Sequence, residues 1–520
     1  MDQRLLSSLL RPEAYPEPTD SVSLQQTHVS WLLFTDRFVY KIKKPVDFGF
    51  LNFTTMDRRR FYCHEEVRLN RRLSPDLYEG VIEIRETPDG AVFDGTGRVI
   101  DYAVKMHRLP AERMLDRLVE TEGVTSDRIR ELGRIIADFH LAAARGSEIS
   151  RHGELGTIRR NWTESMEQVA PFVPNCIPEQ HLTTIRAWSE QFMTEQAPLF
   201  AKRLAEGFIR DCDGDLHLGN ICLTDRFHIF DCIEFNERFR YIDTAADLAF
   251  LLMDLDFHGR SDFGSLLLET YMAETGDGEI ALLLDFYRVY RAFVRGKVTA
   301  FRLNDPATPQ EERSRVQELA TAYFRLARGY LLRPNLPPTL FITCGLMGSG
   351  KSSIARLLAR ELGLVWLRSD RTRKELAGVT VPPGTAEDFG AGLYTIEMTE
   401  ATYGELARLA EEQLRAGRSV VVDATFCKTK DRDRFRQLGA RIGSRCITIA
   451  VECPLDLLAK RLQSRYEERL DISDGRPELL DGQAATFEPP SRDEGDLIRL
   501  HSVGHPFALA EQVLQELKLS

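Results

Sequence analysis

The hydrophobic pattern of residues 340–469 alternates between short apolar runs and longer segments with helical periodicity. The predicted strands span residues 340–344, 364–368, 419–423 and 446–451, and the predicted helices span residues 351–362, 397–416, 431–442 and 455–469. Strands that alternate with helices of this length are typical of a parallel sheet wrapped by helices. We therefore expect an α/β domain in this part of the chain.

The earlier part of the chain has strands first and mostly helices later. Residues 29–43 predict a hairpin with its turn at TDR, and residues 92–106 contain another pair of strands. The clearest helical periodicity lies in residues 57–73, 126–144, 281–303 and 311–332. This order is typical of a two-lobed α+β domain.

A proline-rich segment separates the two patterns. Residues 331–340 read LLRPNLPPTL, and their three prolines stop a helix and favour an extended connection. The sequence therefore predicts two domains, residues 1–335 and residues 336–520.

Composition narrows the class of protein. A formal net charge of −11 disfavours a protein that binds nucleic acid through non-specific backbone contacts. The nine cysteines show no zinc-type spacing. No apolar run approaches the roughly 20 residues that span a membrane, and the first residues lack the features of a signal peptide. We expect a cytoplasmic protein with no membrane contact and no stable protein partner.

Residues 345–352, GLMGSGKS, fit the pattern GxxxxGK[ST] at every fixed position, between a predicted strand and a predicted helix. Such a loop folds its N–H groups around phosphates, and the positive end of the following helix faces the same anion. Lys351 would reach the β- and γ-phosphates, and the Ser352 hydroxyl would bind Mg²⁺. The expected nucleotide-binding residues are Gly345, Gly348, Ser349, Gly350, Lys351, Ser352 and Ser353.

Other residues lie where phosphoryl transfer requires them. Asp423 ends the predicted strand VVVD, in the place of a carboxylate that supports Mg²⁺. Asp370 and Arg373 follow another strand, where the first could accept a proton from a hydroxyl and the second could hold an anion. The alternative for Asp370 is a helix N-cap.

Arg461 and Arg465 share one face of a predicted helix. They could stabilise the charge of a transition state, as the arginines of a lid do. The alternative is a solvated face, which Arg469 would extend.

This combination of motifs resembles the P-loop kinases of the polynucleotide kinase, zeta toxin and chloramphenicol phosphotransferase group. The resemblance covers about 180 residues and rests on the phosphate loop, on Asp370 and Arg373, on DATF at residues 423–426, and on the arginine pair. It implies that Asp370 activates a 5′-hydroxyl and that Arg373 contacts a neighbouring phosphate. A small phosphorylated metabolite would suit the same residues.

Residues 210–231 contain a second set of candidate residues. Asp215 is followed five positions later by Asn220, which is the spacing of a kinase catalytic loop, and a short hairpin then returns at Asp231. Asp215 would accept the proton of a substrate hydroxyl, while Asn220 and Asp231 would bind Mg²⁺.

The segment GDLHLGN resembles the aminoglycoside phosphotransferase family, including the choline and homoserine kinases, whose pattern is H-G-D-x-H-x-x-N. Asp215, His217 and Asn220 match this pattern, whereas Asp213 stands where the family has its first histidine. The resemblance also implies that Asp247 fixes the loop.

An ATP-anchoring lysine and its helix glutamate should lie earlier in the chain. Lys41 and Glu66 are the expected pair, with Lys43 and Glu65 as the alternatives. No G-x-G-x-x-G precedes Lys41, so other backbone groups must cover the phosphates. We expect residues 102–109 to link the two lobes.

The remaining candidates are weaker. Arg291 and Arg295 share one face of a predicted helix, and we expect that face to be solvated, with an anion pocket as the alternative. His140 has no ligand spacing and is interpreted as structural.

Together the two patterns resemble bacterial fusions of an aminoglycoside phosphotransferase-like kinase domain with a P-loop kinase domain. Both domains would use ATP and Mg²⁺ to phosphorylate a hydroxyl, on a small molecule or at a nucleic-acid end. The alternatives are a nucleotide-binding regulatory protein with a silent first domain, and a nucleotide-sugar kinase similar to zeta toxins.

Overall fold

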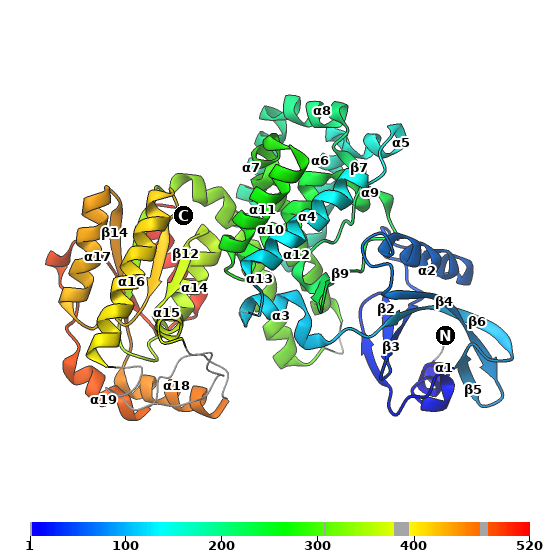
Figure 1. Ribbon diagram of the computed structural model, residues 1–520, viewed down its shortest axis with the longest axis horizontal. Coiled ribbons are helices and arrows are strands. Elements are labelled where there is room, and N and C mark those ends of the chain that lie inside the picture. The colour runs from blue at the N-terminus through cyan, green and yellow to red at the C-terminus, as the bar shows by residue number, and fades with distance from the viewer. Residues whose placement is uncertain (1–2, 122, 306–307, 379–394, 469–476, 520) are drawn as a thin grey trace. The chain divides into compact units, whose positions relative to one another are not determined.

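The computed structural model describes residues 3–121, 123–305, 308–378, 395–468 and 477–519 (Figure 1). Backbone contacts divide the chain into two compact units, Met1–Phe324 and Arg325–Ser520. The division lies within helix α13 (Gln310–Leu332), ahead of the proline-rich segment at which the sequence predicts the boundary. Each unit is described by itself below.

The first unit begins with a six-stranded sheet in which every neighbouring pair is antiparallel. Its order is β1-β2-β3-β6-β4-β5. The strands are β1 (Ser23–Gln26), β2 (Ser30–Phe34), β3 (Phe38–Lys43), β4 (Tyr78–Thr87), β5 (Gly90–Phe93) and β6 (Arg98–His107). The predicted hairpin is confirmed as β2 and β3. The prediction that residues 102–109 form a linker is wrong, because residues 102–107 are the last part of β6, which is paired with β3 on one side and β4 on the other.

Each face of this sheet is covered by a different segment. Helix α2 (Met56–Asn70) packs against β4 and β6, and Cys63 and Val67 enter the core on that side. The first helix, α1 (Gln3–Ser8), and the turn after it cover the opposite face, where Leu9 and Tyr15 join a second core. Because neighbouring strand residues point to opposite faces, Lys41 and Lys43 both point toward the α2 side.

The rest of the first unit is mainly helical. Its longer helices are α4 (Ser126–Ala142), α6 (Leu155–Val169), α7 (Glu179–Glu195), α8 (Ala197–Glu206), α10 (Thr244–Phe257), α11 (Ser261–Thr275), α12 (Ala281–Phe301) and the start of α13. Helix α10 is buried along its whole length, and α11 and α12 pack against it. The small hairpin of β8 (Ile221–Leu223) and β9 (Phe227–Ile229) confirms the one predicted from the sequence.

The second unit is a five-stranded parallel sheet in the order β12-β13-β11-β14-β15. The strands are β11 (Thr339–Cys344), β12 (Val365–Arg368), β13 (Val420–Asp423), β14 (Arg445–Glu452) and β15 (Asp496–His501). The helices are α14 (Lys351–Leu362), α15 (Ser369–Leu376), α16 (Ile396–Arg415), α17 (Thr429–Ile442), α18 (Leu455–Glu468), α19 (Pro477–Thr486) and α20 (Pro506–Glu516). The predicted α/β domain with a parallel sheet is confirmed.

Two apolar cores lie on the two faces of this parallel sheet. One contains residues of α14 and α20, and the other contains residues of α16 and α17. β11 is the central strand and is buried along its full length, so the loop that follows it opens at the middle of the sheet's carboxyl edge. Ligands of open α/β sheets bind at this edge.

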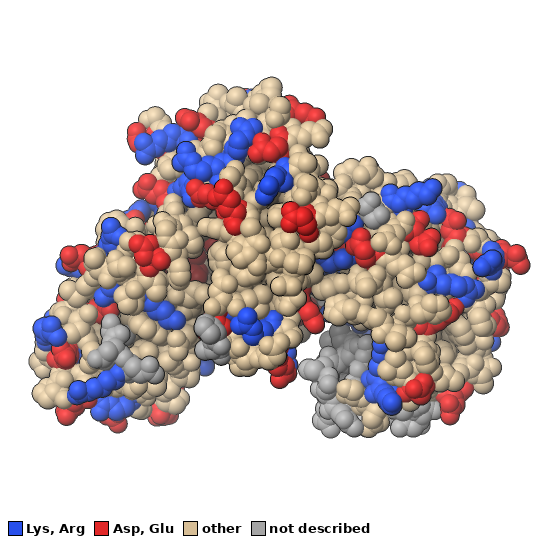
Figure 2. Space-filling model, turned by 180° about the vertical axis from the view of Figure 1, so that it is seen from behind, with Lys and Arg blue, Asp and Glu red and all other residues tan. Residues whose placement is uncertain are grey.

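Acidic and basic side chains are interspersed over the face of the molecule shown in Figure 2, and neither sign gathers there into a long stripe among the described residues. On this face, the described residues therefore form no basic track of the kind that non-specific binding to a nucleic-acid backbone requires. Among the helices that the structure describes, none has the length and apolar character needed to cross a membrane.

Candidate functional site

The predicted phosphate loop connects β11 to α14 in the second unit. Glycine is required at its first position, because Gly345 has φ +149° and a Cβ there would lie 2.5 Å from the carbonyl oxygen of Val451. Gly350, with φ +95°, precedes the first turn of α14. The loop therefore turns back on itself and aims the start of α14 at the edge of the sheet, which is the arrangement that binds phosphate.

Lys351 lies inside this loop. Its side chain is almost fully buried, and Nζ donates a hydrogen bond to the carbonyl oxygen of Leu346 at 2.7 Å. Burial lowers the pKa of Lys351, against the opposing effect of nearby acids that include Asp423 and Asp370. The structure thus places both predicted carboxylates near the loop lysine.

Asp423 ends β13, beside the loop. The Ser352 hydroxyl donates a hydrogen bond to the Asp423 carboxylate, and Trp366 Nε1 donates to its Oδ2 at 3.3 Å. Burial raises the pKa of Asp423, while Lys351 and Ser352 act in the opposite direction. A hydroxyl and a carboxylate held together are hard oxygen donors of the kind that Mg²⁺ prefers, so the residues present fit this ion.

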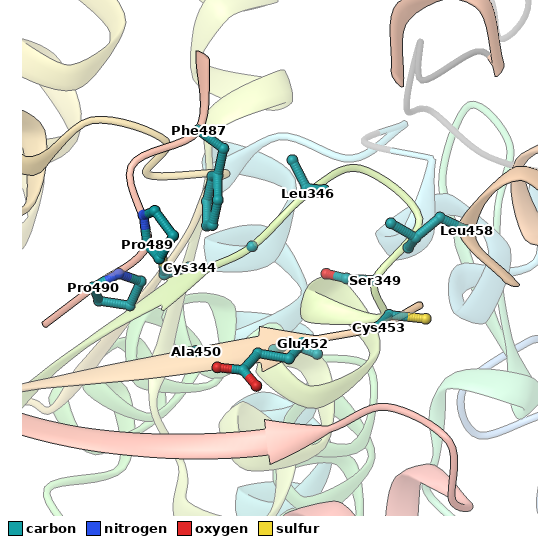
Figure 3. A pocket seen from close by; sticks show the side chains of 12 residues that line it. Cys344, Leu346, Ser349, Ala450, Glu452, Cys453, Leu458, Phe487, Pro489 and Pro490 are labelled. Atoms are coloured by element: carbon teal, nitrogen blue, oxygen red, sulfur yellow. The ribbon is translucent and has the colours of Figure 1, made fainter. Parts of the chain in front are cut away.

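A cavity of about 220 Å³ adjoins the first half of the loop, at the carboxyl ends of β11 and β14 (Figure 3). Its lining is mainly apolar, and Phe487 forms one wall. The Ser349 hydroxyl is buried within this lining and has no hydrogen-bond partner among the residues that the structure describes. Of the predicted nucleotide-binding residues, Gly345 and Ser349 line this cavity.

Asp370 and Arg373 lie on the short helix α15, after β12. Arg373 is buried, and its Nη1 is 3.5 Å from Asp370 Oδ1. The alternative in which Asp370 caps this helix is wrong, because Arg368 occupies the N-cap position and Asp370 lies within the first turn. Asp370 and Arg373, the two residues predicted to contact the phosphoryl acceptor, therefore form an ion pair with each other.

Arg461 also reaches the phosphate loop. Its guanidinium donates to the hydroxyl and to the carbonyl oxygen of Ser502, and a Cβ on Gly350 would lie 4.0 Å from its Nη1. The alternative of a solvated face is therefore wrong for Arg461. The side chain of Arg465 and the whole of Arg469 lie outside the described residues.

Two residues near the loop escaped the sequence analysis. Ser502 follows β15, at the edge where α/β sheets bind ligands, so its position offered a signal once that strand was recognised. Gln483 lies on α19, and its Oε1 accepts the N–H of Met347 at 2.7 Å. Nothing in the pattern around Gln483 indicates this contact.

The loop of residues 213–220 lies between β7 (Ile209–Asp211) and β8 in the first unit. Asn220 Nδ2 donates to the backbone oxygen and to Oδ2 of Asp215, both at 3.1 Å. Burial disfavours the ionised form of Asp215, but His217, Arg295 and Arg291 outweigh it, so the pKa of Asp215 is lowered. A carboxylate that stays ionised and partly exposed can accept a proton from a hydroxyl.

Asp231 follows β9 and has φ +65°, an unusual backbone conformation for a residue that is not glycine. Such conformations are concentrated at functional sites. Lys41 Nζ lies 2.5 Å from Asp231 Oδ1 and 2.8 Å from Glu66 Oε1. The structure therefore brings together the predicted lysine, its helix glutamate and the predicted metal ligand.

Lys43 is not an alternative to Lys41, because both lysines contact Glu66. Lys43 Nζ lies 2.6 Å from Glu66 Oε2 and also pairs with Glu234, which the sequence analysis did not identify. Glu65 instead pairs with Arg68 at the surface of α2.

Buried carboxyl groups contact the loop of residues 213–220 and hold its backbone in place. Asp247 accepts hydrogen bonds from the N–H groups of Asp213 and Gly214, at 3.0 and 2.9 Å, and from His140, whose Nε2 is 3.1 Å away. Burial, together with Asp247 and Asp215, raises the pKa of Asp213 well above its ordinary value. His140 is fully buried in this network and accordingly has a structural place.

The prediction of a solvated face for Arg291 and Arg295 is wrong. Arg291 is buried and donates to the carbonyl oxygens of Gly214 and Ala246, both at 3.0 Å. Arg295 Nη1 lies 3.2 Å from His217 Nε2. Helix α12 packs on α10, so its arginines reach the loop of residues 213–220 instead of water.

Comparison with known proteins gives matches to the second unit alone and matches to both units. The family model described as "AAA domain" matches residues 340–490. A gluconokinase of Gluconobacter oxydans is 26% identical over 181 residues, covering 35% of this chain and 92% of that protein. A shikimate kinase of Psychrobacter sp. is 25% identical over 181 residues, covering 35% and 92%.

Residues 340–490 are a P-loop kinase-type domain. An ATP-dependent kinase is the enzyme class that these matches support for the second unit. The crystal structure of a sugar kinase from Janibacter sp. is also similar, with a TM-score of 0.28 and 23% identity over 35% of this chain and 96% of that one.

An uncharacterized protein of Mycobacterium tuberculosis is similar over both units. It is 29% identical over 487 residues, which cover 94% of this chain and 95% of that protein. For the first unit, the resemblance to aminoglycoside phosphotransferases stays a prediction, as does the resemblance of the second unit to polynucleotide kinases.

Proposed function

We propose that the chain is an ATP- and Mg²⁺-dependent phosphotransferase with one centre in each unit. The observation that carries the proposal for the second unit is the hydrogen bond between Ser352 and Asp423, beside Lys351. These three groups are the ones that a P-loop kinase uses to hold a nucleotide and its magnesium ion.

In the second unit, Asp370 accepts the proton of the acceptor hydroxyl while the oxygen attacks the γ-phosphorus of ATP. The bond from that phosphorus to the β–γ bridging oxygen breaks, and ADP leaves with the electron pair. Lys351 and Arg461 stabilise the negative charge on the transferring group. Ser352 and Asp423 would hold Mg²⁺, which neutralises charge on the phosphates when it is bound.

The acceptor of the second unit is a hydroxyl-bearing small molecule with an anionic group. The names of the relatives support this choice, because gluconate and shikimate are both hydroxylated carboxylates. Arg373 is suited to an anion of this kind, because a guanidinium forms paired hydrogen bonds with a carboxylate or a phosphate. A 5′-hydroxyl polynucleotide end is the second candidate, since the pair of Asp370 and Arg373 suits a hydroxyl next to a phosphate.

In the first unit, Asp215 accepts the acceptor's proton, Lys41 anchors the ATP phosphates, and Asn220 and Asp231 would hold Mg²⁺. The contacts of Lys41 with Glu66 and Asp231 support this proposal, because they place a buried cation beside the predicted metal ligand, which lies 190 residues later in the chain. The acceptor of this unit is a small molecule. Both reactions take place in the cytoplasm, without a membrane or a stable protein partner.

The test is transfer of label from γ-labelled ATP, with Mg²⁺, to gluconate, shikimate, a nucleotide sugar and a 5′-hydroxyl oligonucleotide. Wild type is compared with Lys351→Ala and Asp215→Ala, and the matched controls are the exposed residues Lys460→Ala and Asp225→Ala. We expect Lys351→Ala to abolish labelling of one acceptor and to leave the activity of the first unit intact.

Each other outcome is informative. Labelling of the oligonucleotide alone would establish an end kinase, and labelling of the nucleotide sugar would favour a toxin-like activity. If ATP binds but no acceptor in a broad screen is labelled, the chain is a nucleotide-binding regulator and the proposal fails.

A further inference from the structure

We propose that Lys43 and Glu234 are positioning residues that hold Glu66 in place while Lys41 moves from Asp231 to the nucleotide. This inference rests on the proposed kinase centre of the first unit. It concerns two residues that touch neither the metal ligands nor the catalytic aspartate in the structure's hydrogen-bond network.

The geometry begins with the spacing of the two lysines on β3. Because they are two residues apart, both side chains point to the same face of the sheet, toward α2. Each contacts a different oxygen of Glu66, Lys41 at 2.8 Å from Oε1 and Lys43 at 2.6 Å from Oε2. One buried carboxylate therefore bridges two ammonium groups.

The outer members of the network are also carboxylates. Asp231 contacts Lys41, and Glu234, three residues later, contacts Lys43. The five side chains thus form a chain of alternating charge, with three acids and two bases. The pairs at its two ends differ in burial, because Asp231 is 45% exposed whereas Lys43 and Glu234 are 1% and 6% exposed.

This difference in burial assigns different roles to the two lysines. Lys41 faces the solvent-exposed end of the network, so it is the lysine that can turn toward a phosphate. When it does so, Glu66 loses part of its contact with one cation, and a fully buried carboxylate without a cation is strongly destabilised. Lys43 remains beside Glu66, because it pairs with Glu234 and its Nζ lies 4.9 Å from the centre of the Phe53 ring. It therefore keeps Glu66 ionised and in position.

Glu234 has a second consequence for the metal site. It follows Asp231 closely in sequence, and its ion pair ties this segment to β3. The chain has no glycine-rich loop before Lys41 to order the phosphates. The positions of Lys41 and Asp231 therefore depend more heavily on ion pairs such as that between Lys43 and Glu234. The spacing K-x-K followed by D-x-x-E is the sequence signature of this arrangement.

The experiment uses full-length protein carrying Lys351→Ala, so that ATP turnover reports on the first unit. Into this parent we introduce Lys43→Met together with Glu234→Met. The double substitution removes both members of the ion pair, so neither charge stays buried without its partner. The matched control is Arg59→Met with Asp101→Leu, a buried ion pair between α2 and β6 that lies outside the network. Glu234→Gln is a second, isosteric variant of the network.

We expect the pair of substitutions to raise KM for ATP and the Mg²⁺ concentration for half-maximal rate by about 10- to 100-fold, the range for losing a group that orients a ligand-binding side chain. Thermal unfolding should remain close to that of the parent. Glu234→Gln should also raise KM for ATP and the Mg²⁺ concentration for half-maximal rate, but by a smaller factor. The control, Arg59→Met with Asp101→Leu, should leave these two values near those of the parent.

The inference is overturned if the folded double variant keeps the parent's KM for ATP and the parent's Mg²⁺ dependence, because the pair would then be structural only. Failure of the underlying proposal gives a different result. If Lys41→Met and Asp215→Ala have the same ATP turnover as the parent, the first unit is not a phosphotransferase, and the inference falls with it.

Discussion

Arg461 donates hydrogen bonds to both oxygens of Ser502, at 2.9 Å to the hydroxyl and 2.8 Å to the carbonyl. The contact links α18 to the segment that follows β15. Ser502 in turn lies against the phosphate loop, because a Cβ on Gly350 would be 3.1 Å from its hydroxyl. The arrangement holds the Arg461 guanidinium beside Gly350, the residue that precedes Lys351, where negative charge would develop in the proposed phosphoryl transfer.

Arg461→Ala should therefore lower kcat of the second unit's reaction by about 10²- to 10³-fold, the usual effect of losing one donor to a developing charge. KM for ATP should change less, because the loop backbone supplies most of the ground-state binding. Arg445→Ala is the control, since that arginine is half exposed and pairs with Asp496 at the opposite end of β14. A normal rate in Arg461→Ala would assign this side chain to structure alone.

Asp423→Asn tests the magnesium site. The substitution keeps the shape of the side chain but removes the charge, so the Mg²⁺ concentration for half-maximal activity should rise by about 10- to 100-fold. A titration of label transfer against Mg²⁺ measures this. Asp456→Asn, at an exposed position in the first turn of α18, should leave the titration unchanged. A titration of Asp423→Asn that overlays the wild type would place the metal elsewhere.

The sequence predicted the second unit more completely than the first because of how parallel sheets are buried. β11 is buried at every residue and therefore reads as an apolar run. β15 is an edge strand with the sequence DLIRLH, in which polar residues interrupt the apolar ones, and it was missed for that reason. β4, YEGVIEIRET, escaped recognition in the same way.

Site residues were predictable where the motif is local and unpredictable where the partner is distant. Asp215 and Asn220 were identified by their spacing alone. Glu234 pairs with a lysine 191 residues away, and no local pattern carries that information. The pattern around Arg291 is that of a polar helix face. The helix packs on α10, however, and Arg291 donates to the carbonyl oxygen of Gly214 in the loop of residues 213–220.

A buried ion pair joins the C-terminal part of α13 to α14. Arg325 pairs with Glu361, and the two side chains are 8% and 3% exposed. Arg325→Met leaves Glu361 buried without this cation, so the free energy of unfolding should fall by about 3–5 kcal/mol. Arg325→Met with Glu361→Leu should be close to wild type, because it replaces both charges with apolar groups.

Urea-induced unfolding of the full chain measures both variants of this pair. The matched control is Arg408→Met, which breaks an exposed pair with Glu405 and should leave the free energy of unfolding close to that of wild type. Equal destabilisation in the single and double variants would show that packing at this position matters more than charge.

Lys297 predicts a pH dependence of the first unit's stability. Its Nζ donates to Ser165 at 3.1 Å and to Gln168 at 2.9 Å. Burial lowers the pKa of Lys297 from 10.5 to about 8, against the opposing effect of Glu164 and with a smaller contribution from Arg238. Between these two pH values the unfolded chain binds the lysine proton and the folded chain does not. The free energy of unfolding should therefore rise with pH in this window, by up to about 3 kcal/mol.

The measurement is the difference in unfolding free energy between wild type and Lys297→Met at pH 7, 8, 9 and 10. Because Met cannot titrate, the difference should be constant below about pH 8 and should shift in favour of wild type as the pH increases. Lys297→Arg is the control, since a guanidinium stays protonated throughout and should show no such gain. Parallel stability curves for wild type and Lys297→Met would mean that this lysine keeps its charge in the folded protein despite its burial.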